Sequence, residues 1–128
     1  MSEKIHFCCV ASGTPFERTN QYPRKVPQAN VDDSINLVLQ KVSRVDHRRT
    51  LTYKDNIDIH YKISKGVCFI CVADSRYRKR ICFALLDDME QNWHRGAIKG
   101  SSGDRFLKER LEYFNDTRND VCVCLVVC

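Results

Sequence analysis

The feature that most constrains this chain is a series of three strand-like runs joined by very short polar connections. The runs are Thr50–Tyr53, Ile57–Ile63 and Val67–Ala73, and they are rich in β-branched and aromatic residues. Only Lys54-Asp55-Asn56 and Ser64-Lys65-Gly66 separate them. A parallel crossover needs a dozen or more residues, so connections this short require antiparallel neighbours. The sequence therefore predicts an antiparallel meander at the centre of the fold.

A hairpin is expected at the start of the chain. Lys4–Ala11 is rich in strand formers, and Ser12–Pro15 follows it with residues that favour a tight turn. The second arm, Phe16–Gln21, is weakly patterned and is soon followed by prolines, which donate no hydrogen bond to a ladder. We expect a short second strand that runs into a loop.

Between the hairpin and the meander the apolar spacing becomes that of a helix. Three- and four-residue steps separate Val31, Ile35, Val38, Leu39, Val42 and Val45. Asn30 is expected as the N-cap, and acidic residues follow it in the first turn, where they suit the positive end of a helix.

Two more helices are predicted after the meander. The apolar positions of the first are Ile81, Cys82, Leu85, Leu86, Met89 and Trp93, and it stops before Gly96. We expect a glycine-bearing loop over Gly96–Gly103 and then a helix with Asp104 near its start and Leu107, Leu111 and Phe114 along one face. The order of elements favours the α+β class, with helices covering an antiparallel sheet.

Composition limits the function classes. The chain has 128 residues, 43% of them hydrophobic, which suits one domain with a core. A net charge of +5 spread along the chain describes a solvated basic surface better than a nucleic-acid grip. We recognise no signal peptide and no run near the ~20 apolar residues of a membrane-spanning helix. The scattered histidines and adjacent aspartates form no catalytic motif, so we expect no enzyme, no cofactor and no small-molecule substrate.

Eight cysteines are present, and most lie inside apolar strand-like runs, so we interpret them as reduced thiols of a cytoplasmic protein. Cys68 and Cys71 have the spacing of a redox or metal pair. Residues three apart on a strand point to opposite faces, which favours core packing for both. A thiol-redox or metal-binding protein built on this pair is the alternative from another function class.

Several stretches together resemble the longin domain of the vesicle-side long SNARE proteins (the vesicle-associated membrane protein type). They are Phe7–Thr14, Leu51–Tyr53, Ile59–Tyr61, Gly66–Asp74 and Arg80–Leu86. The resemblance covers Ile5 to about Asp116. It implies a profilin-like fold, in which a five-stranded antiparallel sheet carries one helix on one face and two on the other.

The resemblance also implies a function in membrane traffic. Longin domains regulate SNARE assembly and sort vesicle proteins by holding a helical or extended partner segment beside the first helix and third strand. Carried over to this sequence, the partner-binding groove consists of Ile35, Leu39, Val42, Leu51 and Tyr53. The partner would be a SNARE helical segment or an adaptor peptide. A longin-like subunit of a coat adaptor or tethering complex is the alternative within this class, and a plain core role for Leu51 and Tyr53 is the alternative for the residues.

We divide the chain into a longin domain, residues 1–116, and a short apolar cysteine-rich tail, residues 117–128. No heptad-patterned segment or membrane anchor follows the third helix in this sequence, so we expect no fusogenic activity from it alone. A free-standing regulator, an isolated domain and a shortened product of a longer SNARE remain open.

Two regions could contact membranes. Arg76, Arg78, Lys79 and Arg80 form the densest basic cluster, which could meet an anionic surface or could be an ordinary solvated face. Cys122, Cys124 and Cys128 in the tail are candidates for lipidation, with an extra strand or a loose tail as alternatives. We therefore expect a cytoplasmic protein with peripheral contact to vesicle or endomembrane surfaces.

Overall fold

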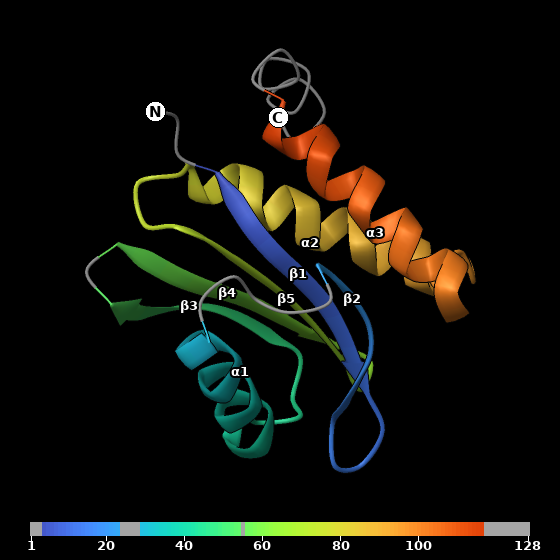
Figure 1. Cartoon of the computed structure of the whole chain (residues 1–128). Helices are drawn as coiled ribbons and strands as arrows, with labels where there is room; N and C mark the ends of the chain where they lie inside the picture. The colour runs from blue at the N-terminus through green and yellow to red at the C-terminus, as the bar shows by residue number, and fades with distance from the viewer. Residues whose placement is uncertain (1–3, 24–28, 55, 117–128) are drawn as a thin grey trace.

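The computed structural model describes residues 4–23, 29–54 and 56–116, which form one five-stranded sheet with three helices (Figure 1). The elements are β1 (Ile5–Ser12), β2 (Glu17–Tyr22), α1 (Ala29–Lys41), β3 (His47–Lys54), β4 (Ile57–Ser64), β5 (Val67–Asp74), α2 (Lys79–His94) and α3 (Gly100–Asn115). All neighbouring strands are antiparallel, in the order β2-β1-β5-β4-β3. The predicted meander is β3-β4-β5, and β1 adds to its far side.

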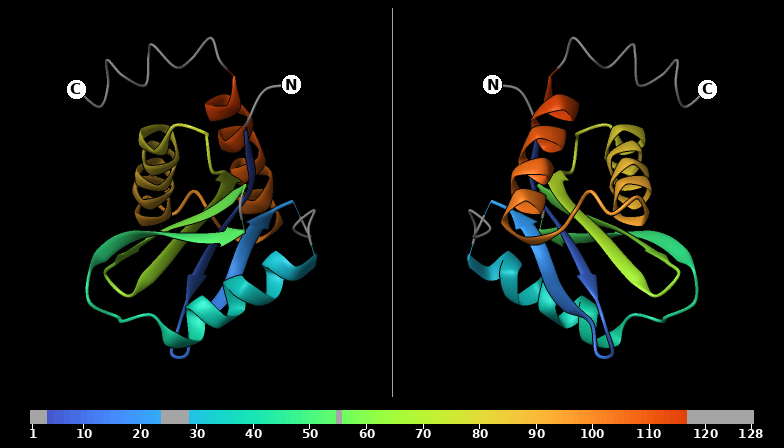
Figure 2. Two further views of the ribbon diagram at one scale, coloured as in Figure 1. Left: turned by 90° about the vertical axis from the view of Figure 1, so that its left-hand side faces the viewer. Right: turned by 90° about the vertical axis from the view of Figure 1, so that its right-hand side faces the viewer.

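Helices cover both faces of the sheet, α1 on one and the pair α2 and α3 on the other (Figure 2). Strand β1, which lies between β2 and β5, is buried on both faces, so its side chains alternate between two cores. Phe7 and Cys9 join the core under α1, whereas Cys8 and Val10 join the core under α2 and α3. The predicted α+β class and profilin-like longin arrangement are confirmed.

The turn between β4 and β5 explains why this connection can be so short. Lys65 and Gly66 both have positive φ, 51° and 79°, and Ser64 pairs directly with Val67. Two consecutive positive φ angles define a type I′ turn, whose twist matches that of the flanking strands. Glycine reaches the second of these angles without steric cost, so Gly66 sets the register of the hairpin.

The first helix differs from its predicted limits at both ends. It begins at Ala29, so Asn30 lies within the first turn and is not the N-cap. It ends at Lys41, which leaves Val45 outside the helix with 72% of its surface exposed. The helical spacing of apolar residues continues by chance into the connection between α1 and β3. The predicted helix was therefore too long, because Val45 has no core surface to pack against there.

Two other predicted limits also move. The segment Gly100–Gly103, expected as a loop, is the first turn of α3, with Lys99 as its N-cap residue. Strand β3 starts at His47 rather than Thr50, because the polar residues His47–Arg49 pair with β4 along the edge of the sheet. Both errors arise from polar or glycine-rich composition that tertiary contacts override.

Candidate functional site

The five predicted groove residues all belong to or pack against the core under α1, and we call them together the α1–β3 surface: Ile35, Leu39, Val42, Leu51 and Tyr53. Ile35 and Leu39 are buried and form its base. Val42, Leu51 and Tyr53 are only partly buried and pack against the same core at its margin. Contact with a partner would therefore involve the last three side chains directly, while the first two support them.

The face on which Leu51 lies follows from strand register. Leu51 pairs with Ile59 and Arg49 pairs with Tyr61, and residues paired across antiparallel strands share a face. Ile59 and Tyr61 belong to the core under α1, so Leu51 and Arg49 face α1 as well. Among the described residues β3 pairs only with β4, which makes it an edge strand. Half-covered apolar side chains on an edge strand are available to a partner.

Three residues at this surface were missed by the sequence prediction. Val38 is partly buried beside Val42, and Leu37, on the outer side of α1, is 49% exposed. His47 lies at the start of β3, where its Nδ1 is 2.6 Å from the Val45 carbonyl oxygen and its Nε2 is 3.0 Å from the Tyr61 hydroxyl. His47, Arg49 and Leu51 are each two residues apart, so they share one face of a strand. A predicted strand that began at His47 would have identified this histidine.

Arg18 fixes α1 on its other flank. The Arg18 guanidinium forms an ion pair of 2.6 Å with Asp32 and a 2.7 Å hydrogen bond to Asn36 Oδ1. Beside these contacts lies an open pocket of about 370 Å³, lined by Pro15, Phe16, Glu17, Arg18, Asn36, Leu39 and Gln40. At 100° per residue, Asn36 and Gln40 lie on the side of α1 away from Val38 and Val42. Leu39 lines the pocket and also belongs to the α1–β3 surface, so the two adjoin at that side chain.

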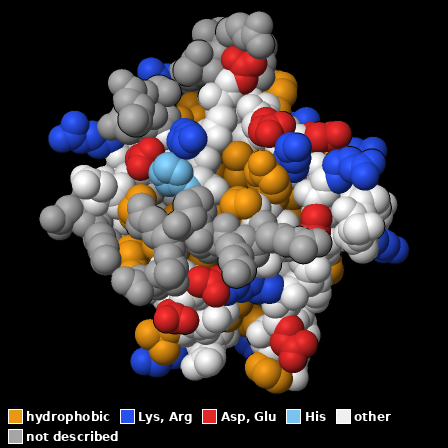
Figure 3. All heavy atoms as spheres, in the orientation of Figure 1, with side chains coloured by type: hydrophobic (Ala, Val, Ile, Leu, Met, Phe, Trp, Pro, Cys, Tyr) orange, Lys and Arg blue, Asp and Glu red, His pale blue; other side chains and the backbone are white. Residues whose placement is uncertain are grey.

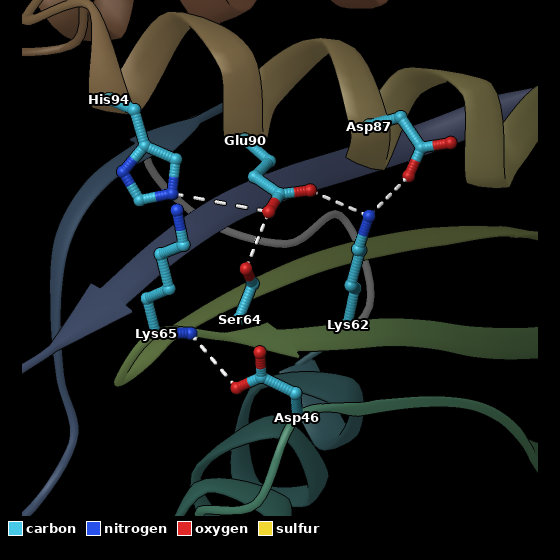
Figure 4. Close-up of polar contacts among 7 residues, drawn as sticks. All are labelled: Asp46, Lys62, Ser64, Lys65, Asp87, Glu90 and His94. Carbon is cyan, nitrogen blue, oxygen red and sulfur yellow. Dashed lines mark hydrogen bonds and ion pairs between the residues drawn. The ribbon is translucent and has the colours of Figure 1, made fainter.

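A polar cluster joins α2 to β4 (Figure 4). Lys62 Nζ lies 2.7 Å from Asp87 Oδ1 and 2.6 Å from Glu90 Oε1, and the Ser64 hydroxyl donates to Glu90 Oε2. Burial lowers the pKa of Lys62, but its hydrogen bonds to Asp87 and Glu90 outweigh burial and raise the value. Burial likewise opposes ionisation of Glu90, whose pKa is lowered overall by the hydrogen bond from Lys62.

The adjacent aspartates of α2 serve different neighbours. Asp87 bonds Lys62 on β4, whereas Asp88 forms an ion pair with Arg110 on α3, at 2.8 Å. Each carboxylate is thus directed to a separate element, as expected for adjacent helical residues that point in different directions. These ion pairs connect α2 to β4 on the sheet and to the neighbouring helix α3.

The predicted basic cluster lies in the β5–α2 connection and the first turn of α2. Arg76, Arg78, Lys79 and Arg80 are all exposed, and the first turn of α2 contains no acidic residue. Positive charges at a helix N-terminus oppose the macrodipole, so this arrangement does not favour helix stability. On the face seen in Figure 3, basic side chains are interspersed with acidic ones, as on an ordinary solvated surface.

The cysteine pair singled out in the sequence is divided by the sheet. Cys68 lies in the core under α1, and Cys71 lies in the core under α2 and α3. Burial raises the pKa of both thiols, which keeps both protonated at neutral pH. The alternative prediction of a redox or metal site that contains both Cys68 and Cys71 is therefore wrong, because the two thiols lie on opposite faces of the sheet.

The described residues contain no cluster of three potential metal-binding side chains. No helix in the described part of the chain combines the length and apolar character needed to cross a membrane. The three candidate lipidation sites, Cys122, Cys124 and Cys128, lie outside the described residues.

A five-stranded antiparallel sheet between one helix and two defines a longin-like interaction domain. Residues 19–98 match the family described as Longin: Regulated-SNARE-like domain, which is more than half of the chain. The chain belongs to this longin family.

The chain is also similar to known transport proteins. It is 30% identical over 73 residues to the protein transport protein SEC22 of Yarrowia lipolytica, which covers 57% of this chain and 32% of that protein. It is 24% identical over 75 residues to the protein transport protein sec22 of Schizosaccharomyces pombe, covering 59% and 33%. The vesicle-trafficking protein SEC22b-B of Danio rerio is 26% identical over 57 residues, covering 44% and 26%. The matches thus span about a third or less of these relatives.

Proposed function

We propose that this longin domain acts in vesicle traffic as a non-catalytic interaction module, which regulates SNARE assembly and the sorting of vesicle proteins. It does so by holding a SNARE helical segment or an adaptor peptide on the α1–β3 surface. Family membership and the similarity to SEC22 transport proteins support a role in vesicle traffic. We place the domain on the cytoplasmic side of vesicle or endomembrane surfaces.

The observation that carries the proposal is the incomplete burial of Val42, Leu51 and Tyr53. They continue an apolar core to the margin of the sheet, and each remains partly accessible to solvent. A partner that buries one such side chain gains roughly 1.5–3 kcal/mol, before the cost of ordering the complex is subtracted. An amphipathic helix or an extended segment fits a surface formed by a helix and an edge strand.

Charge at the same surface suggests the composition of the partner. Arg49 faces α1, two residues before Leu51, and its side chain is exposed. A carboxylate of the partner placed here would pair with the guanidinium at the margin of the apolar contact. Such a rim contact would serve orientation and association rate more than affinity.

Replacing both Leu51 and Tyr53 with serine tests the proposal. We expect the fold to survive, since neither side chain is fully buried, and the binding of SNARE helical peptides to weaken at least tenfold, or about 1.4 kcal/mol. Binding is followed by fluorescence titration against a panel of SNARE and adaptor peptides, and folding by circular dichroism. Thr52→Ser provides a matched control on the same strand, because Thr52 is exposed on the opposite face.

Two outcomes would contradict the proposal. A folded double variant that binds every peptide as well as the parent would remove the α1–β3 surface from recognition. An unfolded double variant would mean that Leu51 and Tyr53 are core residues. Binding of adaptor or tether peptides alone would favour the coat-subunit alternative.

The basic cluster is proposed as a peripheral membrane contact. Four exposed cations at a helix N-terminus oppose the macrodipole, so a role outside folding would account for their position. Substituting Arg76 and Lys79 with glutamine should reduce co-sedimentation with phosphatidylserine vesicles and leave neutral vesicles unaffected. Equal sedimentation of parent and variant would assign the cluster to the ordinary solvated surface.

A further inference from the structure

A row of side chains with polar atoms crosses the sheet beneath α2. Strand register pairs Cys8 with Cys71, Cys71 with His60, and His60 with Thr50, so the four residues follow one another across β1, β5, β4 and β3. The first three are completely buried. Helix α2 places Cys82 above this row, with the Cys71 sulfur 3.9 Å from the Cys82 carbonyl oxygen. Tertiary structure thus creates a cluster of thiols and an imidazole that no local sequence motif predicts.

His60 is oriented by its neighbours. Its Nδ1 lies 2.8 Å from the Thr50 hydroxyl, and its ring packs edge-on against Phe83 at a centroid distance of 5.4 Å. If the Thr50 hydroxyl donates to Nδ1, the proton of the neutral ring is on Nε2. Nε2 is buried, and it has no hydrogen-bond partner among the described residues. A buried N–H without an acceptor is costly, so an anionic neighbour would be stabilised here.

Cys82 is suited to be that neighbour. It is the fourth residue of α2, where the helix macrodipole favours negative charge. The hydrogen bond from Cys71 and the positive potential of the His60 imidazole lower the pKa of Cys82 against the opposing effect of burial. Cys82 is completely buried, so an oxidant reaches it only when α2 opens locally from the sheet. Complete burial instead raises the pKa of Cys71, which therefore stays a protonated donor. Once a thiolate has been oxidised to a sulfenic acid, a neighbouring thiol can condense with it to a disulfide.

We propose that Cys82 and Cys71 are a peroxide-sensitive redox pair, in which Cys82 is the nucleophile, His60 positions its thiolate, and Cys71 closes a reversible disulfide. In the first step the Cys82 thiolate attacks hydrogen peroxide; an S–O bond forms, the O–O bond breaks, and hydroxide leaves. In the second step the Cys71 sulfur attacks the sulfenic acid, the S–O bond breaks, and water leaves with the proton of Cys71. The disulfide ties α2 to β5, and a dithiol reductant restores both thiols.

This assignment differs from the pair suggested by sequence spacing. Cys68 and Cys71 lie on opposite faces of the sheet, whereas Cys71 and Cys82 lie in one core. The other thiol next to Cys71 is Cys8, whose pKa is raised well above its ordinary value by burial and by Cys9. Cys8 therefore lacks the thiolate needed for the first step, and it serves as an internal comparison.

Peptide mapping of the full-length chain tests the proposal. The folded protein is treated with dilute hydrogen peroxide, its remaining thiols are alkylated in denaturant, and it is digested with trypsin. Cleavage after Arg76, Arg80 and Arg95 separates Cys71, in residues 66–76, from Cys82, in residues 81–95. We expect these two peptides to appear linked and to separate on reduction.

Matched variants assign the sulfur atoms. Cys68→Ala and Cys71→Ala alter the same tryptic peptide on opposite faces of the sheet. The linked peptide should persist in Cys68→Ala and disappear in Cys71→Ala and Cys82→Ala, with folding of each variant confirmed by circular dichroism. His60→Gln should slow formation of the link at least tenfold, because glutamine cannot stabilise the thiolate in the same position. If a core variant fails to fold, differential alkylation of the parent with two mass labels reports the same cysteines.

Several results would overturn the inference. Absence of the linked peptide from the folded parent would reject the redox pair. A link from Cys71 to Cys8, or a Cys82 link that survives Cys71→Ala, would reject the assignment of partners. An unchanged rate in folded His60→Gln would reject the positioning role of His60.

Discussion

Gly103→Ala separates intrinsic helix propensity from tertiary packing. Gly103 is buried in the first turn of α3 and does not have a left-handed backbone, so alanine is conformationally allowed there. Propensity alone predicts a gain of about 1 kcal/mol for this substitution within a helix. A Cβ at this position, however, would lie 2.8 Å from Asn20 Nδ2 and 2.9 Å from the carbonyl carbon of Ile98. The backbone contact cannot move as a flexible side chain would.

The magnitude follows from what the new methyl group displaces. Asn20 is buried, and its Nδ2 donates to the Gly100 carbonyl at 2.8 Å and to Asp104 Oδ1 at 2.9 Å. Overpacking costs about 1–3 kcal/mol. A displaced, unsatisfied amide costs about 1–3 kcal/mol more. After the gain in propensity is subtracted, we expect Gly103→Ala to lower the free energy of unfolding by about 1–5 kcal/mol.

Urea denaturation followed by circular dichroism measures this change. With a denaturant slope of about 2 kcal/mol per molar, the midpoint should fall by roughly 0.5–2.5 M. Ser101→Ala is the control, because Ser101 is exposed in the same turn and its substitution should change stability by less than about 0.5 kcal/mol. An unchanged or raised midpoint for Gly103→Ala would refute the close approach of α3 to β2.

Two further predictions concern the chain end and acid stability. Deletion of Val121–Cys128 should leave the melting temperature nearly unchanged, because the predicted domain ends at Asp116; a large fall would assign the segment to the fold. Asp74 accepts a hydrogen bond from the Lys4 N–H at 2.8 Å and lies 2.9 Å from His6 Nε2. Burial opposes ionisation of Asp74, but these contacts outweigh it and lower the pKa. A lowered folded-state pKa contributes stability that is present above the unfolded value of 3.8 and is lost as the pH falls through the folded value. Asp74→Asn should therefore be less stable than the parent at pH 7, and its stability should fall less than the parent's below about pH 4. Parallel stability curves for the two proteins would contradict this.

Local pattern was sufficient for the class of fold and for the face of the sheet or helix on which each predicted groove residue lies. Short connections required antiparallel strands, and helical spacing identified the buried stripe of α1 through Ile35 and Leu39. Period-two alternation put Leu51 and Tyr53 on one face of β3. These inferences succeeded because they depend on side-chain periodicity within one element, which the backbone geometry of helices and strands determines.

Tertiary structure decided what depends on contacts between distant residues. The first turn of α3 was missed because glycine disfavours helices, and only the close packing of α3 against β2 at Asn20 gives Gly103 a place there. The start of β3 was missed because its polar residues pair with β4 at the sheet edge. The spacing of Cys68 and Cys71 drew attention to a pair that the sheet divides. Strand register and the placement of α2 instead bring Cys71, Cys82 and His60 together. Local residue spacing predicts neither the register nor the placement of α2, because both depend on how whole elements pack.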